Sequence, residues 1–167
     1  TGAVTLVALV LLLSQAPAVY RGEVLSWSVP WLPMIGLSFS FFLDGLGLFF
    51  AALILGMGLL IILYARYYLS EKDPLGLFYF YLLLFQGAMV GIVLSNNILL
   101  LLVFWELTSL TSFLLIGYWR ELPASRQGAR MALIVTGGGG LSLIAGMLML
   151  GHIAGSYEIT EILQRGE

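Results

Sequence analysis

Long runs of apolar residues, separated by short polar stretches, set the pattern of this 167-residue chain. A helix needs about 20 apolar residues to cross a hydrocarbon layer about 30 Å thick, and most of the runs approach that length. The first run is short for a span and would be completed by residues before Thr1, so we expect the chain to be part of a longer polytopic subunit. The pattern predicts helices at 3–16, 41–64, 77–94, 98–118 and 129–153.

The stretch between the first two runs has a different pattern. Polar and apolar residues alternate over 24–29, which indicates a short β ribbon. Trp27 and Trp31 flank Pro30, and tryptophan favours the boundary between membrane and water. We therefore predict an all-α integral membrane fold, a single membrane domain over 1–167 with five transmembrane helices and one interfacial loop.

The composition agrees with a membrane protein. The chain is 60% hydrophobic and only 10% charged, with a mean hydropathy of +1.03, whereas about a quarter of the residues of a soluble domain are charged. A net charge of −2 argues against nucleic acid as a partner. The absence of cysteine excludes disulfides and thiolate sites. Because His152 is the only histidine, the sequence predicts no multi-histidine metal site and no cofactor.

Charges in the polar stretches predict the orientation. Consecutive loops alternate between the two sides of a membrane, and lysine and arginine accumulate on the cytoplasmic side. We therefore expect the tryptophan-containing loop to face outward from a multi-pass protein of the cytoplasmic membrane. The inner side would hold five basic residues and the outer side two, namely Arg66, Lys72, Arg120, Arg126 and Arg130 against Arg21 and Arg165.

Glu106 is the only charged residue of the fourth apolar run. A helix would place it roughly 12 Å from Ile98, close to the membrane midplane. A carboxylate at that depth costs about 3 kcal/mol and needs a proton or a partner. Ser109 and Ser112 lie near the same helix side and are candidate supporting hydroxyls. We interpret Glu106 as a proton-relay or gating carboxylate; the alternative is a neutral, hydrogen-bonded glutamate that locks two helices together.

Other polar residues are weaker candidates for proton transfer. Asp44 stands near the start of the second helix, where a cap is favoured over a relay. His152, near the outer end of the last helix, is interpreted as solvated, with a proton exit as the alternative. Arg130 lies near the inner start of that helix, too far along it to neutralise Glu106. The glycine run at 137–140 indicates close helix packing, with a local weak point as the alternative.

Three stretches of the chain carry a recognisable wording: FLDGLGL at 42–48, YLLLFQGAM at 81–89, and FWELTS at 104–109 followed by SFLLIGYWR at 112–120. Together they resemble the antiporter-like membrane subunits shared by Mrp-type cation/proton antiporters, respiratory complex I and membrane-bound hydrogenases. The last stretch looks most like the large A component of Mrp antiporters. The resemblance extends from about residue 32 to the C-terminus, and the first helix fits the preceding helix of the family by position.

The resemblance implies roles for two residues. Glu106 matches the family's membrane-embedded glutamate, which is thought to pair with a lysine on a later helix, and Asp44 belongs to the family's Asp-Gly-Leu element. The chain would correspond to roughly the second to sixth helices of a subunit with fourteen or more. Related A components often carry a lysine near this point of the chain, whereas here Met131 follows Arg130. The role of that lysine is therefore not carried over to Arg130.

We therefore predict part of a proton-translocating subunit of a multisubunit sodium/proton antiporter, a secondary transporter rather than an enzyme. Its partners would be the remainder of the same subunit, other membrane subunits, the lipid bilayer, transported protons and sodium. Sodium is implied by the resemblance alone. One alternative is a proton-pumping subunit of complex I or a membrane-bound hydrogenase. The other is a structural scaffold in which Glu106 is a helix clamp.

Overall fold

A computed structural model describes residues 1–70 and 73–165 of the chain. Two strands form a hairpin, β1 (Leu25–Leu32) and β2 (Leu37–Leu43), joined by the short 3₁₀ helix η1 (Pro33–Ile35). The α-helices are α1 (Gly2–Ser14), α2 (Ala16–Tyr20), α3 (Gly45–Tyr68), α4 (Leu75–Leu94), α5 (Ile98–Ile116), α6 (Pro123–Ala154) and α7 (Ile159–Arg165).

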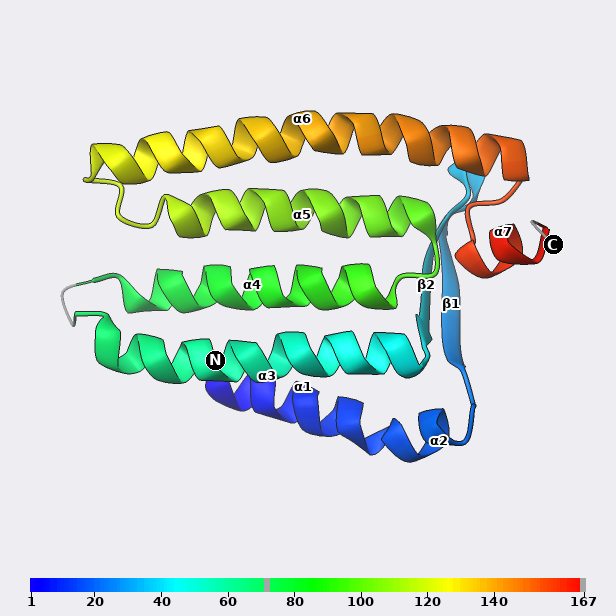
Figure 1. The fold of residues 1–167 in the computed structure, drawn as a ribbon, viewed down its shortest axis with the longest axis horizontal. Coiled ribbons are helices and arrows are strands. Elements are labelled where there is room, and N and C mark those ends of the chain that lie inside the picture. The colour runs from blue at the N-terminus through cyan, green and yellow to red at the C-terminus, as the bar shows by residue number, and fades with distance from the viewer. Residues whose placement is uncertain (71–72, 166–167) are drawn as a thin grey trace.

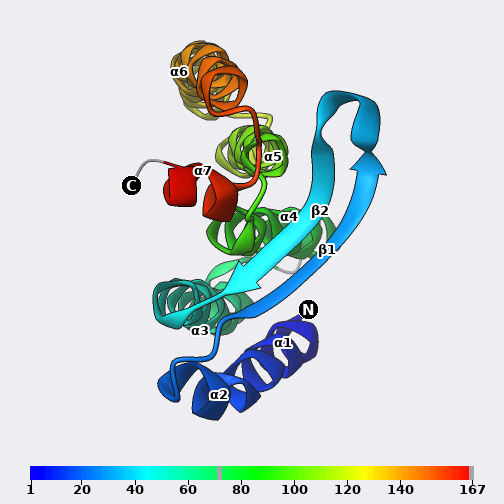
Figure 2. The same cartoon turned by 90° about the vertical axis from the view of Figure 1, so that its right-hand side faces the viewer.

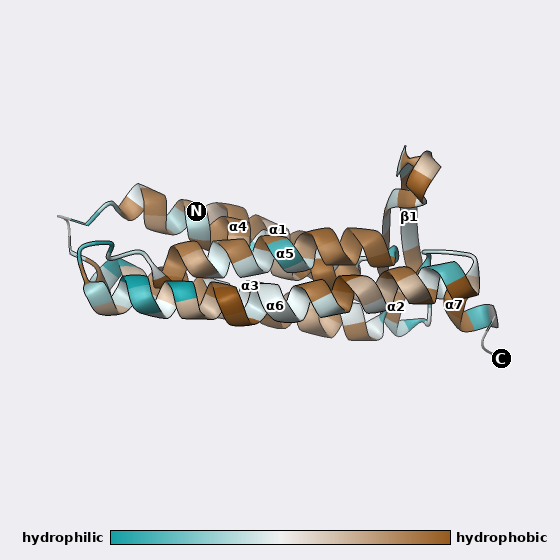
Figure 3. Cartoon of the chain, turned by 90° about the horizontal axis from the view of Figure 1, so that it is seen from above, coloured by the Kyte–Doolittle hydropathy of each residue, from teal (hydrophilic) through white to brown (hydrophobic). Residues whose placement is uncertain are grey.

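The long helices lie side by side in a row that follows their order in the sequence (Figure 1). Helix α1 packs on α3, and α3, α4, α5 and α6 each contact the next. Within the described residues, five helical segments are long and apolar enough to cross a membrane, α1 and α2 counting together as Gly2–Tyr20. Hydrophobic residues predominate along the helices, and hydrophilic ones gather near their ends (Figure 3). The predicted all-α membrane fold is confirmed.

The predicted β ribbon is present and lies across one end of the bundle (Figure 2). Its strands are antiparallel, with Ser28 opposite Ser40, and the ring of Trp31 stacks on that of Phe39 at 4.6 Å. Strand β2 contacts α3, α4 and α5. We call this end the hairpin end and the opposite end, where 117–122 join α5 to α6, the loop end.

The predicted start of the second helix at residue 41 is wrong. Residues 41–43 belong to β2, where Phe41 pairs with Trp27 and Leu43 with Leu25. A short apolar run fits a strand or a helix equally well by its pattern, and here pairing with β1 decides the outcome. The helix begins at Gly45 and continues to Tyr68.

The predicted bounds of the other helices also differ from the observed ones. Helix α6 begins at Pro123 instead of 129, because proline suits the first helical position and the polar residues after it form exposed helical turns rather than a loop. It ends at Ala154, and the following Gly155 caps it with a φ of 70°, which favours glycine. Helix α4 begins two residues earlier than predicted and α5 ends two residues earlier.

Glycines on one element repeatedly face a large side chain from the next. At each such position a β carbon would overlap the neighbouring side chain, so the glycine allows a close approach. We call these positions glycine notches. The pairs are Gly58 with Gln86, Gly91 with Phe104, Gly140 with Glu106, and Gly151 with Tyr157. They join α3 to α4, α4 to α5, α5 to α6, and α6 to the segment before α7.

A polar cluster fastens the turn between α4 and α5 to the C-terminal segment at the hairpin end. The Glu158 carboxylate accepts hydrogen bonds from Nδ2 of Asn96 and of Asn97, each at 2.9 Å, and from the hydroxyl of Ser38. Asn97 is fully buried, and its Oδ1 accepts from the backbone N–H groups of 99 and 100 at the start of α5. This cluster fixes where α5 begins.

Candidate proton-transfer site

Glu106 lies near the middle of α5, eight residues after Ile98 and ten before Ile116. The residue is half-buried, and its Oε1 atom is buried with no hydrogen-bond partner in the described part of the chain. Among the described residues, the ion pair that forms does not involve Glu106: it joins Arg21 to Glu23 at 3.0 Å in the exposed loop before β1. Within 1–70 and 73–165, the carboxyl group of Glu106 therefore has neither a basic partner nor a donor for Oε1.

The Glu106 carboxyl reaches the backbone of α6 at Gly140. A β carbon on Gly140 would lie 3.3 Å from Cδ of Glu106 and 3.7 Å from Oε2, and it would overlap Oε1. Gly140 is buried, whereas a β carbon on residue 137, 138 or 139 would meet open space within this chain. The glycine run is therefore a packing element for α5 at one position, Gly140, and not along its whole length.

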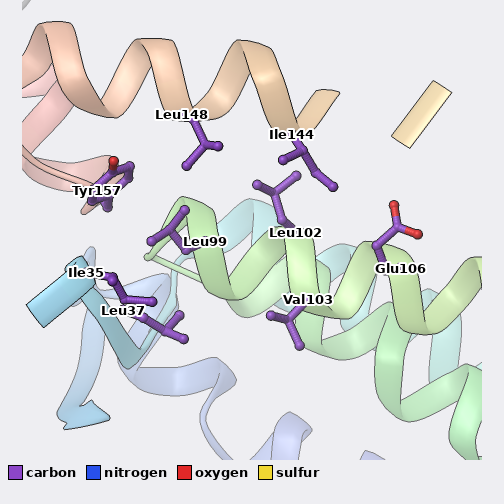
Figure 4. A pocket seen from close by; sticks show the side chains of 9 residues that line it. All are labelled: Ile35, Leu37, Leu99, Leu102, Val103, Glu106, Ile144, Leu148 and Tyr157. Carbon is purple, nitrogen blue, oxygen red and sulfur yellow. The ribbon is translucent and has the colours of Figure 1, made fainter. Parts of the chain in front are cut away.

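A cavity of about 720 Å³ extends from Glu106 toward the hairpin end. Glu106 stands at one end and Tyr157 at the other, and α6 contributes side chains that face α5 (Figure 4). The remaining lining side chains are aliphatic: Ile35, Leu37, Leu99, Leu102, Val103, Ile144 and Leu148. These apolar walls offer water few hydrogen bonds, so a negative charge on Glu106 would be poorly solvated from this side.

The two serines predicted to support Glu106 lie one and two turns away on α5. The Ser109 hydroxyl donates to the backbone carbonyl of Trp105 at 3.3 Å, and Oε1 of Glu106 is left without a donor. Ser109 is buried and Ser112 is half-buried. A supporting role for either hydroxyl stays a prediction.

Asp44 is the N-cap of α3. Its Oδ1 accepts a hydrogen bond of 2.7 Å from the backbone N–H of Gly47, which satisfies a donor that the first turn leaves free. This is the capping geometry expected from the sequence. A role for Asp44 in proton transfer stays a prediction.

The structure does not bring Arg130 or His152 to Glu106. Gly140 marks the level of Glu106 on α6, and Arg130 precedes it by ten residues, roughly 15 Å along the helix. His152 follows it by twelve residues, roughly 18 Å, in the exposed last turn. Arg130 instead lines a small cavity of about 230 Å³ at the loop end together with Arg120 and Arg126.

Two further polar groups lack partners in the part of the chain that the structure describes. Nε2 of Gln86 is buried on α4, and the hydroxyl of Tyr118 is buried just beyond α5. Burial raises the pKa of Tyr118, and the negative charge of Asp73 adds to that rise. In the sequence, Gln86 is the most polar interior residue of the helix predicted at 77–94 and part of a family motif, but its contact with Gly58 is not predicted. Nothing near Glu158 in the sequence indicates its three donors at the hairpin end.

A row of apolar helices, five of them long and apolar enough to cross a membrane, with a lone carboxyl group halfway along α5, is the architecture of a polytopic membrane protein. Two family models match the chain: "NADH:quinone oxidoreductase/Mrp antiporter, TM" over 95–166, and "NADH-Ubiquinone oxidoreductase (complex I), chain 5 N-terminus" over 31–79. The chain belongs to this family of antiporter-like membrane subunits, and the resemblance drawn from its motifs is confirmed.

Curated relatives are similar over nearly the whole chain. The probable K⁺/H⁺ antiporter A/B polypeptide of Rhizobium meliloti (strain 1021) is 48% identical over 166 residues, 99% of this chain. The A1 component of a Na⁺/H⁺ antiporter of Staphylococcus aureus (strain JH9) is 46% identical over 161 residues, 96% of this chain. The chain spans 17% of the first relative and 20% of the second.

Two solved structures have a similar fold. The Mrp complex from Dietzia sp. DQ12-45-1b contains a chain that aligns with a TM-score of 0.81 and 31% identity, covering 93% of this chain and 17% of that one. The archaeal membrane-bound sulfane sulfur reductase aligns with a TM-score of 0.76 over 96% of this chain and 24% of that one. At 18% identity, the second likeness shows the fold alone.

Proposed function

We propose that the chain is part of a proton-translocating subunit of a multisubunit cation/proton antiporter in the cytoplasmic membrane. Glu106 would accept and release the transported proton or gate its path. The names of the two curated relatives, both antiporter components at 46–48% identity, support the antiporter class over a redox-driven complex. The protein would then be a secondary transporter rather than an enzyme.

The observation that carries the role of Glu106 is its unpartnered carboxyl at the middle of α5. A structural clamp would place donors around both oxygens, as the cluster around Glu158 does. Oε1 of Glu106 has no such donor and lies beside an apolar cavity. Because ionisable residues inside membranes commonly mark ion pathways, a proton relay explains this arrangement better than a scaffold.

The counter-charge for Glu106 is proposed to come from outside this chain. The described helices place no basic residue near the level of Gly140 and Glu106, and the nearest arginine on α6 is Arg130 at roughly 15 Å along the axis. A basic residue in the remainder of the subunit would stabilise the carboxylate when close and favour its protonation when distant. Other membrane subunits would complete the assembly.

The transported cation is proposed to be sodium. The name of one relative specifies Na⁺/H⁺ antiport and the name of the other K⁺/H⁺ antiport, so the resemblance extends to both cations. Transport measured with Na⁺ and with K⁺ in otherwise identical vesicles decides between them. Antiport driven by K⁺ alone would contradict the choice of sodium.

Replacement of Glu106 in the intact subunit, within the complete complex, tests the relay. Glu106→Gln keeps the shape of the side chain but removes its titration, and we expect cation-driven proton movement in membrane vesicles to be abolished. Assembly, followed by native electrophoresis, should be unchanged. Glu121→Gln, at an exposed glutamate of the loop end, is the matched control and should keep normal antiport. Normal antiport in Glu106→Gln would reject the relay.

A further inference from the structure

The contact between Glu106 and Gly140 joins residues that are 34 positions apart in the chain. Oε1 of Glu106 occupies the space that a side chain on Gly140 would need, and this oxygen is the one that is buried without a partner. Helix packing alone would be served by any apolar side chain against the glycine. Here the notch receives the single charged side chain of α5.

Gly140 could serve to make α6 compact or pliable, or it could serve the contact with Glu106. The other glycines of the run distinguish these two explanations. If the run only made α6 compact or pliable, its members would be equivalent. They are not, because β carbons on 137, 138 and 139 would meet nothing within 4 Å in this chain, whereas one on Gly140 would overlap Glu106. Gly146, six residues further along α6, also faces open space.

We propose that Gly140 is a positioning residue for Glu106, which holds the carboxyl group against the backbone of α6 and thereby sets where the proton is exchanged. The proposal rests on the proposed function of Glu106. A glutamate side chain has three rotatable bonds and can point along the 720 Å³ cavity or toward α6. The notch accommodates the second arrangement, and a methyl group there would force the first.

Gly140→Ala is therefore expected to act on transport rather than on the helix. Alanine forms helices better than glycine, so the substitution does not weaken α6 itself. It displaces the carboxyl group by the width of a methyl group. Misplacement of a reacting group by about 1 Å can lower a rate roughly a hundredfold, and we expect antiport to fall by roughly tenfold to a hundredfold.

The experiment compares Gly140→Ala with Gly139→Ala and Gly146→Ala in the complete antiporter complex. Antiport in vesicles should fall in the first variant and stay within about twofold of the parent in both controls. The infrared carbonyl band that Glu106→Gln removes should also shift in Gly140→Ala, because the surroundings of the carboxyl change. A purely structural effect of the methyl group would not move that band.

A second variant keeps the test decisive if Gly140→Ala assembles poorly. Glu106→Asp shortens the side chain by one methylene and leaves room for the added methyl group. The double variant should therefore transport better than the product of the two single effects predicts, because the two residues are in contact. Strict independence of the two substitutions would overturn the proposal.

Failure of the relay and failure of the positioning role give different results. Normal antiport in Glu106→Gln would reject the proposed relay, and the role of Gly140 with it. Loss of antiport in Glu106→Gln, combined with equal activity and an unshifted carbonyl band in Gly140→Ala, would reject the positioning role alone.

Discussion

Two glycine notches in this bundle receive polar side chains, and they differ in what the side chain meets there. At the contact of α3 and α4, the amide of Gln86 lies at Gly58, where Nε2 has no partner among the described residues while Oε1 accepts a hydrogen bond of 3.3 Å from Thr5 on α1. At the contact of α5 and α6, the carboxyl of Glu106 lies at Gly140 with no partner for Oε1 among the described residues. The same packing device thus holds a neutral group in one place and an ionisable group in the other.

The polar side chains in the two notches also differ in how deeply they are buried. Gln86 is 5% exposed and Thr5 is 2% exposed, so three helices enclose the first junction. Glu106 is only half-buried and borders the larger of the two neighbouring cavities, about 720 Å³ against about 380 Å³ beside Gln86. A neutral amide that is enclosed on three sides suits a fixed junction. A carboxyl group with room beside it can change its position, as the proposed relay requires.

The largest expected effect comes from filling the notch at Gly58. A β carbon there would fall on Nε2 of Gln86 and lie 3.2 Å from Oε1, so Gly58→Leu must expel the amide and break its bond to Thr5. Overpacking of a tight core costs about 1–3 kcal/mol or more. We expect the intact subunit to lose thermal stability or to fail to accumulate, measured by fluorescence-detected size exclusion after heating.

Gly56→Leu is the matched control for that prediction. Gly56 lies on α3 two residues before Gly58, and a β carbon on it would meet nothing within 4 Å in this chain. The stability of Gly56→Leu should stay close to that of the parent. Equal losses in both variants would show that the α3–α4 contact does not depend on the Gly58 notch.

Gln86→Leu is expected to be the next most disruptive change. It removes the acceptor of the Thr5 hydroxyl, and a buried donor without a partner costs about 1–3 kcal/mol. Thermal unfolding of the intact subunit should shift downward, and Thr5→Val in the same chain should recover part of the loss. Per assembled complex, antiport should be retained, in contrast to Glu106→Gln. Loss of antiport in well-assembled Gln86→Leu would place both notches in the transport machinery.

The sequence predicts the chemistry of the second notch better than its geometry. Glu106 can be identified as a candidate from the sequence because it is the single charged residue in an apolar run. Which of four consecutive glycines faces it depends on the rotation of α6 about its own axis, and four identical residues in a row carry no polar–apolar pattern that reports this rotation. Gly140 could therefore be identified as the contact of Glu106 on α6 only from the packed structure.

At the hairpin end, by contrast, the sequence predicts part of the local geometry but not the polar contacts. The alternation over 24–29 predicts a strand, but the apolar run that begins at Phe41 fits a helix as well, and only the pairing with β1 places its first three residues in β2. The hydrogen bonds of Glu158 cannot be predicted from its neighbours in the sequence, because its donors, Ser38, Asn96 and Asn97, lie about 60 or more positions away. Local patterns predict single elements, and the contacts between distant elements decided the remainder.

Thr5→Val gives the smallest expected effect and tests how α1 is held. Thr5 is the only buried residue of α1 among those that the structure describes, and its bond to Gln86 is long at 3.3 Å. Side-chain hydrogen bonds between membrane helices contribute about 0.6 kcal/mol on average, so the midpoint of thermal unfolding should fall only slightly. A crosslink between cysteines introduced at Gly2 and Ile62, whose side chain approaches within 3.6 Å of a β carbon on Gly2, should still form. Loss of that crosslink in Thr5→Val would mean that the polar contact, and not the apolar face of α1, holds the helix against α3.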